Sequence, residues 1–134
     1  MNKRQCIIIR SSQNNKKHIC VDVTNAKQII GYINQDDRYK KKFNHIVELI
    51  LTNKRNSELY DKEDISSSCK DVTAMKFFKG QENGRLYCKE MAGPNGMFYI
   101  IMSELVDKKK QKRVNGKLKS LIEKVSTYEY EVIT

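Results

Sequence analysis

Residues 85–124 read RLYCKEMAGPNGMFYIIMSELVDKKKQKRVNGKLKSLIEK, and this stretch organises the rest of the sequence. Two apolar runs, 85–91 and 97–106, flank the segment 92–96, which contains a proline and an Asn-Gly pair. Proline and Asn-Gly supply the backbone geometry of a tight turn, so the pattern predicts a β-hairpin. A run of cations and then the helical pattern of 117–124 follow the second strand.

Two helices are predicted before this hairpin. The first spans 26–34 and begins after Asn25, a residue type that often caps helices. The second runs from Asp36 or Asp37 to about Asn53, and its apolar residues recur every three or four positions. We expect the two helices to form a helical hairpin that packs on a sheet.

The remaining strand-like segments complete a single-domain prediction. They lie at 5–10, 18–24, 73–79 and 128–132. We therefore predict one α+β domain over residues 1–134, with a mostly antiparallel sheet packed against an N-terminal helical hairpin and a C-terminal helix. Residues 1–24 would be an additional N-terminal strand pair.

Charge is the strongest compositional signal in the chain. The formal net charge is +10 over 134 residues, and residues 107–119 alone hold seven cations against one aspartate. Concentrated positive charge attracts polyanions and accelerates their encounter with a protein, so nucleic acid is the predicted partner. The alternative is a solvated surface loop that keeps a small protein soluble.

Other features narrow the class of protein. The apolar runs are far shorter than the roughly 20 residues that span a bilayer, and we expect a cytoplasmic protein without a membrane partner. The four cysteines have no Cys-x-x-Cys spacing, so structural thiols are predicted, with a metal site or a disulfide as the alternatives. His18 and His45 are expected at the surface, without a catalytic role.

A cationic and aromatic face is predicted on the strand 85–91. Because side chains alternate along a strand, Arg85, Tyr87 and Lys89 fall on one face. A guanidinium can bind phosphate through two hydrogen bonds, and an aromatic ring can stack on a base. The cations that would extend this RNA-binding face are Lys108, Lys109, Lys110, Lys112 and Arg113. The alternative is a half-buried sheet face in which long Arg and Lys stems cover Tyr87.

Catalysis, if present, is expected without a cofactor or a metal. The sequence has no dinucleotide-binding, phosphate-loop, nucleophile-elbow or zinc-protease motif. RNA carries its own nucleophile, the 2′-hydroxyl, so positioning and charge stabilisation can support its cleavage. The catalytic candidates are Arg85 for the phosphate, Lys89 as an assisting cation, and Glu104 and Tyr128 for proton exchange. Asp107, Tyr130 or a lysine among 108–112 could take these last roles, and the sequence leaves the choice open.

The order of these elements resembles the RelE/HigB-type toxins of bacterial toxin–antitoxin systems. The residues that carry the resemblance are Gly84–Tyr87, the apolar strand Phe98–Met102, the run Leu105–Lys112 and the helix containing Leu118 and Ile122. The resemblance implies a helical hairpin on an antiparallel sheet, translation-dependent cleavage of mRNA on the ribosome, and inhibition by a cognate antitoxin. It also implies that Arg85, and more loosely Lys108, Lys110 and Tyr128, belong to the active surface.

Three other functions remain open at this level. The first is a non-catalytic module that binds nucleic acid or the ribosome, which would show salt-sensitive binding without cleavage. The second is a gyrase-directed toxin of the related ParE branch, which shares the fold. The third is a plain protein-interaction domain.

Overall fold

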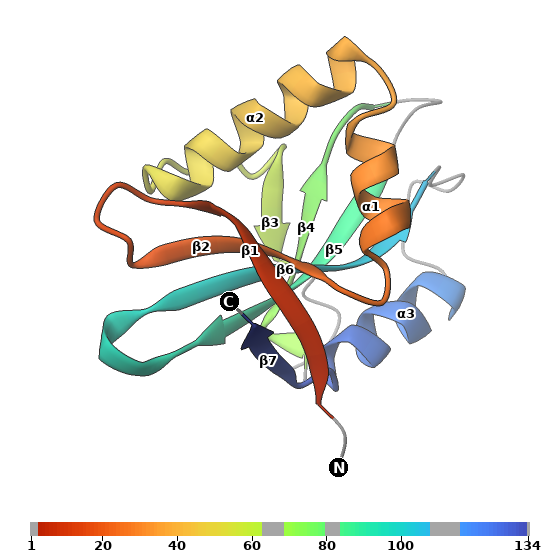
Figure 1. The fold of residues 1–134 in the computed structure, drawn as a ribbon. Coiled ribbons are helices and arrows are strands. Elements are labelled where there is room, and N and C mark those ends of the chain that lie inside the picture. Colours follow the sequence, from red (N-terminus) through yellow and green to blue (C-terminus); the bar gives the residue numbers. More distant parts are fainter. Residues whose placement is uncertain (1–2, 63–68, 80–83, 108–115, 134) are drawn as a thin grey trace.

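The chain folds around one mixed β-sheet with helices on both of its faces (Figure 1). The computed structural model describes residues 3–62, 69–79, 84–107 and 116–133. Its helices are α1 (Ala26–Ile33), α2 (Asp37–Leu51), the short 3-10 turn η3 (Pro94–Gly96) and α3 (Gly116–Ser126). Its strands are β1 (Arg4–Ser11), β2 (Lys17–Asp22), β3 (Tyr60–Lys62), β4 (Val72–Lys76), β5 (Arg85–Ala92), β6 (Phe98–Val106) and β7 (Tyr130–Ile133).

The sheet is larger than expected and mixed in direction. Within the described residues it has seven strands in the order β3-β4-β5-β6-β2-β1-β7. The predicted β5–β6 hairpin is confirmed, but β2 runs parallel to β6 and β7 runs parallel to β1. The prediction of a mostly antiparallel sheet is therefore wrong. Parallel pairing joins segments that are distant in sequence, and local turn signals do not report it.

The N-terminal strand pair is built into this sheet. β1 and β2 pair with each other, and β2 also pairs with β6 in the centre of the sheet. Residues 18–22 are all buried, because α1 and α2 cover one face of β2 and residues of the opposite layer cover the other. The run of apolar residues Ile19-Cys20-Val21 is typical of such a central parallel strand.

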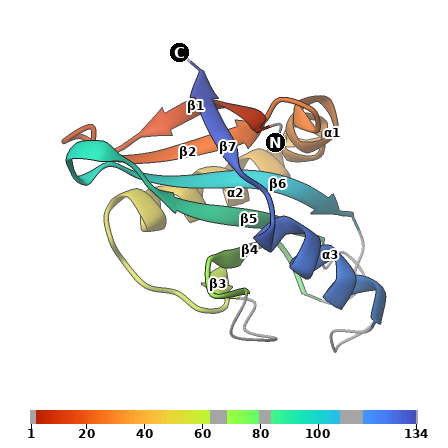
Figure 2. The ribbon, with the colours of Figure 1, turned by 90° about the horizontal axis from the view of Figure 1, so that it is seen from below.

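The helices do not form the predicted N-terminal hairpin. α1 and α2 follow two strands and lie at an angle to one another on the same face of the sheet (Figure 1). Ile29 of α1 and Phe43 and Ile46 of α2 pack there against Leu86 and Met102. Figure 2 shows α3 on the opposite side of the sheet from α2. This second layer matters because the predicted catalytic residues Arg85, Lys89, Glu104 and Tyr128 lie on the α3 side.

Local capping explains where the first two helices begin. Asp36 is the N-cap of α2, and its side chain accepts a hydrogen bond from the Tyr39 amide at 3.0 Å. Asn25, the predicted cap of α1, makes no side-chain capping bond. Its amide instead donates to the carbonyl oxygen of Ser103 at 2.7 Å, which ties the start of α1 to β6.

The four cysteines and His18 all lie inside the protein. All four cysteines are free and buried, as structural thiols should be. His18 is buried rather than exposed, with its ring stacked on Tyr99 and its Nδ1 atom 2.7 Å from the Ser11 hydroxyl. Among the described residues, no helix has the length and apolar character needed to cross a bilayer.

Candidate functional site

Glu104 and Tyr128 form a hydrogen-bonded pair on the α3 side of the sheet. Glu104 lies near the end of β6, and Tyr128 lies between α3 and β7. The Tyr128 hydroxyl donates a hydrogen bond to the Glu104 carboxylate, and the residue is only 7% exposed. Burial, followed by this hydrogen bond, raises the pKa of Tyr128 above that of an ordinary tyrosine. The phenol is therefore a weaker acid than an ordinary tyrosine, and it holds its proton in the hydrogen bond to Glu104.

Arg4 covers the Tyr128 ring. Its guanidinium carbon lies 4.0 Å from the ring centre, within the range of a cation–π interaction. Its Nε atom donates to Asp22 at 2.7 Å, and its side chain remains 27% exposed. Sequence reasoning missed Arg4, because only the parallel pairing of β1 with β7 brings it opposite Tyr130 and beside Tyr128.

A buried carboxylate holds this arginine in place. Asp22 is fully buried, and its Oδ2 atom accepts hydrogen bonds from Arg4 and from the Tyr130 hydroxyl at 2.6 Å. The Tyr130 oxygen also lies 2.8 Å from the Ser103 hydroxyl. The other Asp22 oxygen accepts from the Thr24 amide at 2.8 Å. A buried charge with this many partners is stabilised, so the network fixes Arg4 and Tyr130 relative to β6.

Arg85 shares the sheet face with Glu104. It opens β5, and alternation puts it on the same side as Tyr87, which is the cross-strand partner of Glu104. Arg85 is therefore a diagonal neighbour of Glu104 on that face. The chain before Arg85 is tightly packed: a Cβ atom on Gly84 would collide with the Tyr32 hydroxyl and lie 2.5 Å from the Asp107 carbonyl oxygen. This packing fixes the start of β5.

The other two predicted residues of this strand have structural roles. Tyr87 is fully buried between the sheet and α3, together with Ile122 and Val125. A ring without exposed surface cannot stack on a base, so the assignment of Tyr87 to RNA binding is corrected to a core position. The Lys89 ammonium lies 2.6 Å from Asp71 and 2.6 Å from the Ser126 carbonyl oxygen, and its side chain is 12% exposed. Lys89 thus fastens β5 to the end of α3.

The predicted cationic run cannot be placed in the same way. Lys108, Lys109, Lys110, Lys112 and Arg113 lie outside the described residues. Asp107 ends the described part of this segment and is exposed. Of the predicted catalytic residues, the structure brings Arg85, Glu104 and Tyr128 to one region. Lys89 lies further along β5, where Asp71 and the Ser126 carbonyl oxygen hold its ammonium.

No family model, curated protein or solved structure matches this chain. In the part of the chain that the structure describes, no group of three or more His, Cys, Asp and Glu side chains is placed to hold a metal ion. The groups at the site are a carboxylate, a protonated phenol and two guanidiniums on one face of the sheet.

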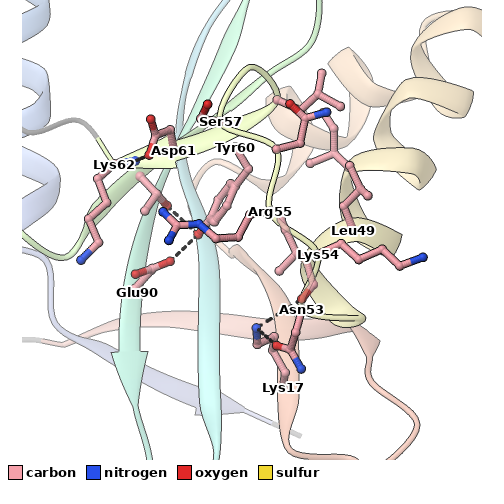
Figure 3. A pocket seen from close by; sticks show the side chains of 15 residues that line it. Lys17, Leu49, Asn53, Lys54, Arg55, Ser57, Tyr60, Asp61, Lys62 and Glu90 are labelled. Carbon is pink, nitrogen blue, oxygen red and sulfur yellow. Dashed lines mark hydrogen bonds between the residues drawn. The ribbon is translucent and has the colours of Figure 1, made fainter.

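A separate cavity of about 270 Å³ lies at the C-terminal end of α2 (Figure 3). On one side, the Tyr60 hydroxyl donates to Glu90 at 2.6 Å. On the other, the Lys17 ammonium lies 2.6 Å from the Asn53 side-chain oxygen and 3.2 Å from the Ile50 carbonyl oxygen. Its lining comes from α2, β2, β3, β4, β5 and the segment between α2 and β3, so no single stretch of the sequence indicates it.

Proposed function

We propose that this protein is a RelE/HigB-like toxin: a metal-independent endoribonuclease that cleaves mRNA on the ribosome and is inhibited by a cognate antitoxin. The observation that carries the proposal is the Glu104–Tyr128 pair. A carboxylate that can accept a proton is hydrogen-bonded to a phenol that can donate one, and Arg85 shares their sheet face. The net charge of +10 favours a polyanionic substrate.

The reaction follows from these groups. The RNA 2′-oxygen attacks the adjacent phosphorus while Glu104 takes the 2′-hydroxyl proton. Arg85 stabilises the negative charge that develops on the phosphate oxygens. The bond from phosphorus to the 5′-oxygen breaks, and Tyr128 protonates the leaving oxygen. Glu104 then returns its proton to the phenolate through their hydrogen bond. The products are a 2′,3′-cyclic phosphate and a 5′-hydroxyl.

The test is cleavage of defined RNA in the presence of EDTA. Wild-type protein should cut an mRNA that is loaded on ribosomes, and the new ends should be a cyclic phosphate and a 5′-hydroxyl. Expression without the antitoxin should arrest growth, and Arg85→Ala should relieve both effects. Intact RNA at all protein concentrations, free or on ribosomes, would reject the nuclease. Arrest that persists undiminished in Arg85→Ala would remove Arg85 from the mechanism.

One observation favours a second candidate, a non-catalytic RNA- or ribosome-binding module. Lys89 is engaged by Asp71 and Ser126, and Tyr87 is inaccessible, so two of the groups first assigned to the active face serve stability. Binding by phosphate contacts alone would weaken steeply with salt and would leave the RNA intact. A gel shift and an RNA integrity assay on the same samples separate the two candidates.

A further inference from the structure

A cationic groove runs along one flank of α2, on the side that faces the β1–β2 hairpin. It consists of two hollows, of about 710 Å³ and about 300 Å³, which have Arg10 and Asn44 in common. Lys40, Asn44 and Glu48 line it from α2, as residues four apart on one helix flank should. We call these two joined hollows the α2 groove. It lies outside the Glu104–Tyr128 site.

The α2 groove continues into the cavity at the end of α2. Lys17 and Asn53 line both the larger hollow and that cavity. The ammonium of Lys17 lies within hydrogen-bonding distance of Asn53 (Figure 3) and of the Ile50 carbonyl oxygen in the last turn of α2. Lys17 therefore stands where the α2 groove meets the cavity. The hollows together form an elongated path rather than a single closed pocket.

The charge of the α2 groove is strongly biased. Its charged lining residues are the cations Arg10, Lys16, Lys17 and Lys40 and one carboxylate, Glu48, a formal +3. Beyond the junction, Lys54, Arg55 and Lys62 line the cavity together with Asp61 and Glu90. A groove with low-dielectric walls and one sign of charge concentrates the opposite charge. The α2 groove is therefore suited to an anionic chain.

The lining of the α2 groove combines polar and apolar side chains. Its amides and hydroxyls include Ser12, Gln13, Asn14, Asn44 and Asn53. Its apolar residues include the core residues Phe43 and Val47 and the half-buried Leu51 and Phe98. Amides and hydroxyls bind phosphates and the edges of unpaired bases, and an aromatic ring can pack against a base, as in the recognition of single-stranded RNA. The lining therefore suits single-stranded RNA, and an acidic amphipathic peptide is the alternative that the test distinguishes.

We infer that the α2 groove binds single-stranded RNA, with phosphates on Arg10 and Lys40 and the strand continuing past Lys17 toward the cavity. The inference deepens the proposed function, since it rests on RNA as the ligand. It adds a binding surface made partly by the N-terminal strand pair. That surface holds a strand on the opposite layer of the sheet from the cleavage site.

The test compares two double variants that each remove two positive charges. Arg10→Gln with Lys40→Gln removes them from the α2 groove. Lys27→Gln with Lys124→Gln removes them from exposed positions on α1 and α3 that do not line it. The probe is a fluorescent 2′-O-methyl decauridylate, which has no 2′-hydroxyl and so reports binding without cleavage. Anisotropy gives its Kd at several salt concentrations.

The groove variant should raise the Kd on the order of tenfold near 0.1 M salt, and the slope of log K against log salt should flatten by about 1.4, or 0.7 per lost contact. The Kd of the control variant should stay within about twofold of wild type, because salt screens charges that lie far from the bound strand. Equal effects of the two variants, or no effect of either, would overturn the inference. So would decaglutamate binding as tightly as the RNA probe.

A second measurement does not depend on any variant folding. A 4-thiouridine oligonucleotide cross-linked to wild-type protein should attach within residues 10–17 and 40–53. Attachment confined to the Glu104–Tyr128 face would overturn the groove. Cleavage of unmodified RNA is scored separately. Binding in the groove without cleavage rejects the nuclease and keeps the groove. Cleavage, together with equal effects of the two double variants on the Kd, keeps the nuclease and rejects the groove.

Discussion

The guanidinium of Arg4 is stacked on the ring of Tyr128, with 4.0 Å between the guanidinium carbon and the ring centre. One residue belongs to the first strand and the other precedes the last. Asp22 holds the guanidinium at its Nε atom, so the charge lies over the ring while the hydroxyl remains directed at Glu104. A substitution at Tyr128 can therefore remove the hydroxyl that donates to Glu104 and keep the ring that contacts Arg4.

Tyr128→Phe should abolish proton donation while it keeps the ring under Arg4. Because a positioned acid contributes roughly 10²- to 10⁴-fold to a rate, we expect RNA cleavage to fall by at least about 100-fold. Loss of this hydrogen bond to a carboxylate should lower the free energy of unfolding by about 1.5–3 kcal/mol. Single-turnover cleavage and urea unfolding measure the two effects.

The matched control for that experiment is Tyr99→Phe. Tyr99 is a half-buried tyrosine of β6 that stacks on His18 and lies outside the site. Its cleavage rate should equal that of wild type. Equal rates in Tyr128→Phe and wild type would exclude Tyr128 as the acid.

Asp22→Asn should destabilise the fold. The substitution removes the charge that compensates Arg4 and that accepts from Tyr130, in a fully buried position. We expect a loss of about 2–3 kcal/mol in the free energy of unfolding, below the range for a fully buried pair because Arg4 is partly exposed. Glu131→Gln, at an exposed position of β7, should change it by less than about 0.5 kcal/mol. Similar urea midpoints for the two variants would contradict the role given to Asp22.

The buried tyrosines should make stability fall at alkaline pH. Burial, and then the hydrogen bond to Asp22, raise the pKa of Tyr130. An unfolded tyrosine has a pKa of about 10. Below that pH the folded and unfolded states both keep the proton, and the contribution of Tyr130 to the free energy of unfolding is fully present. Above it the unfolded state ionises first, so the free energy of unfolding should drop by up to about 1.4 kcal/mol per pH unit for this group.

Tyr130→Phe isolates that contribution. The variant should be less stable than wild type at pH 8, and the difference should shrink as the pH rises above 10. Urea unfolding at half-unit steps from pH 8 to 11.5 measures it. A difference that stays constant across this interval would show that Tyr130 has an ordinary pKa in the folded protein.

Gly84→Ala tests the packing that positions Arg85. The added methyl group would collide with the Tyr32 hydroxyl and approach the Asp107 carbonyl oxygen. We expect a loss of about 1–3 kcal/mol, as for other overpacked sites. Gly31→Ala is the control, because Gly31 is an exposed residue of α1 with nothing near its Cβ position. That change should stabilise the protein by about 0.4–1 kcal/mol. Thermal melts in which both variants shift the melting temperature in the same direction would contradict this account.

Local features of this protein were predictable from sequence because their causes are local. The spacing of apolar residues predicted α2, and the proline and Asn-Gly pair predicted the turn between β5 and β6. Asn95 indeed adopts the left-handed conformation, with φ of 59°. Even here the sequence offered Asp36 and Asp37 equally, and only the hydrogen bond to Tyr39 identifies Asp36 as the cap.

The site depended on contacts that no local pattern encodes. Alternation correctly placed Arg85, Tyr87 and Lys89 on one face, but it could not show that α3 would cover that face and bury Tyr87. Nor could it show that β1 would lie parallel to β7, which brings Arg4 and Asp22 to Tyr128 and Tyr130. Periodicity, turn chemistry and charge are properties of neighbouring residues, so they can be read from the amino-acid order. The partners of each strand and the covered side of the sheet emerge only in the folded chain, because long-range pairing and burial depend on all of its elements.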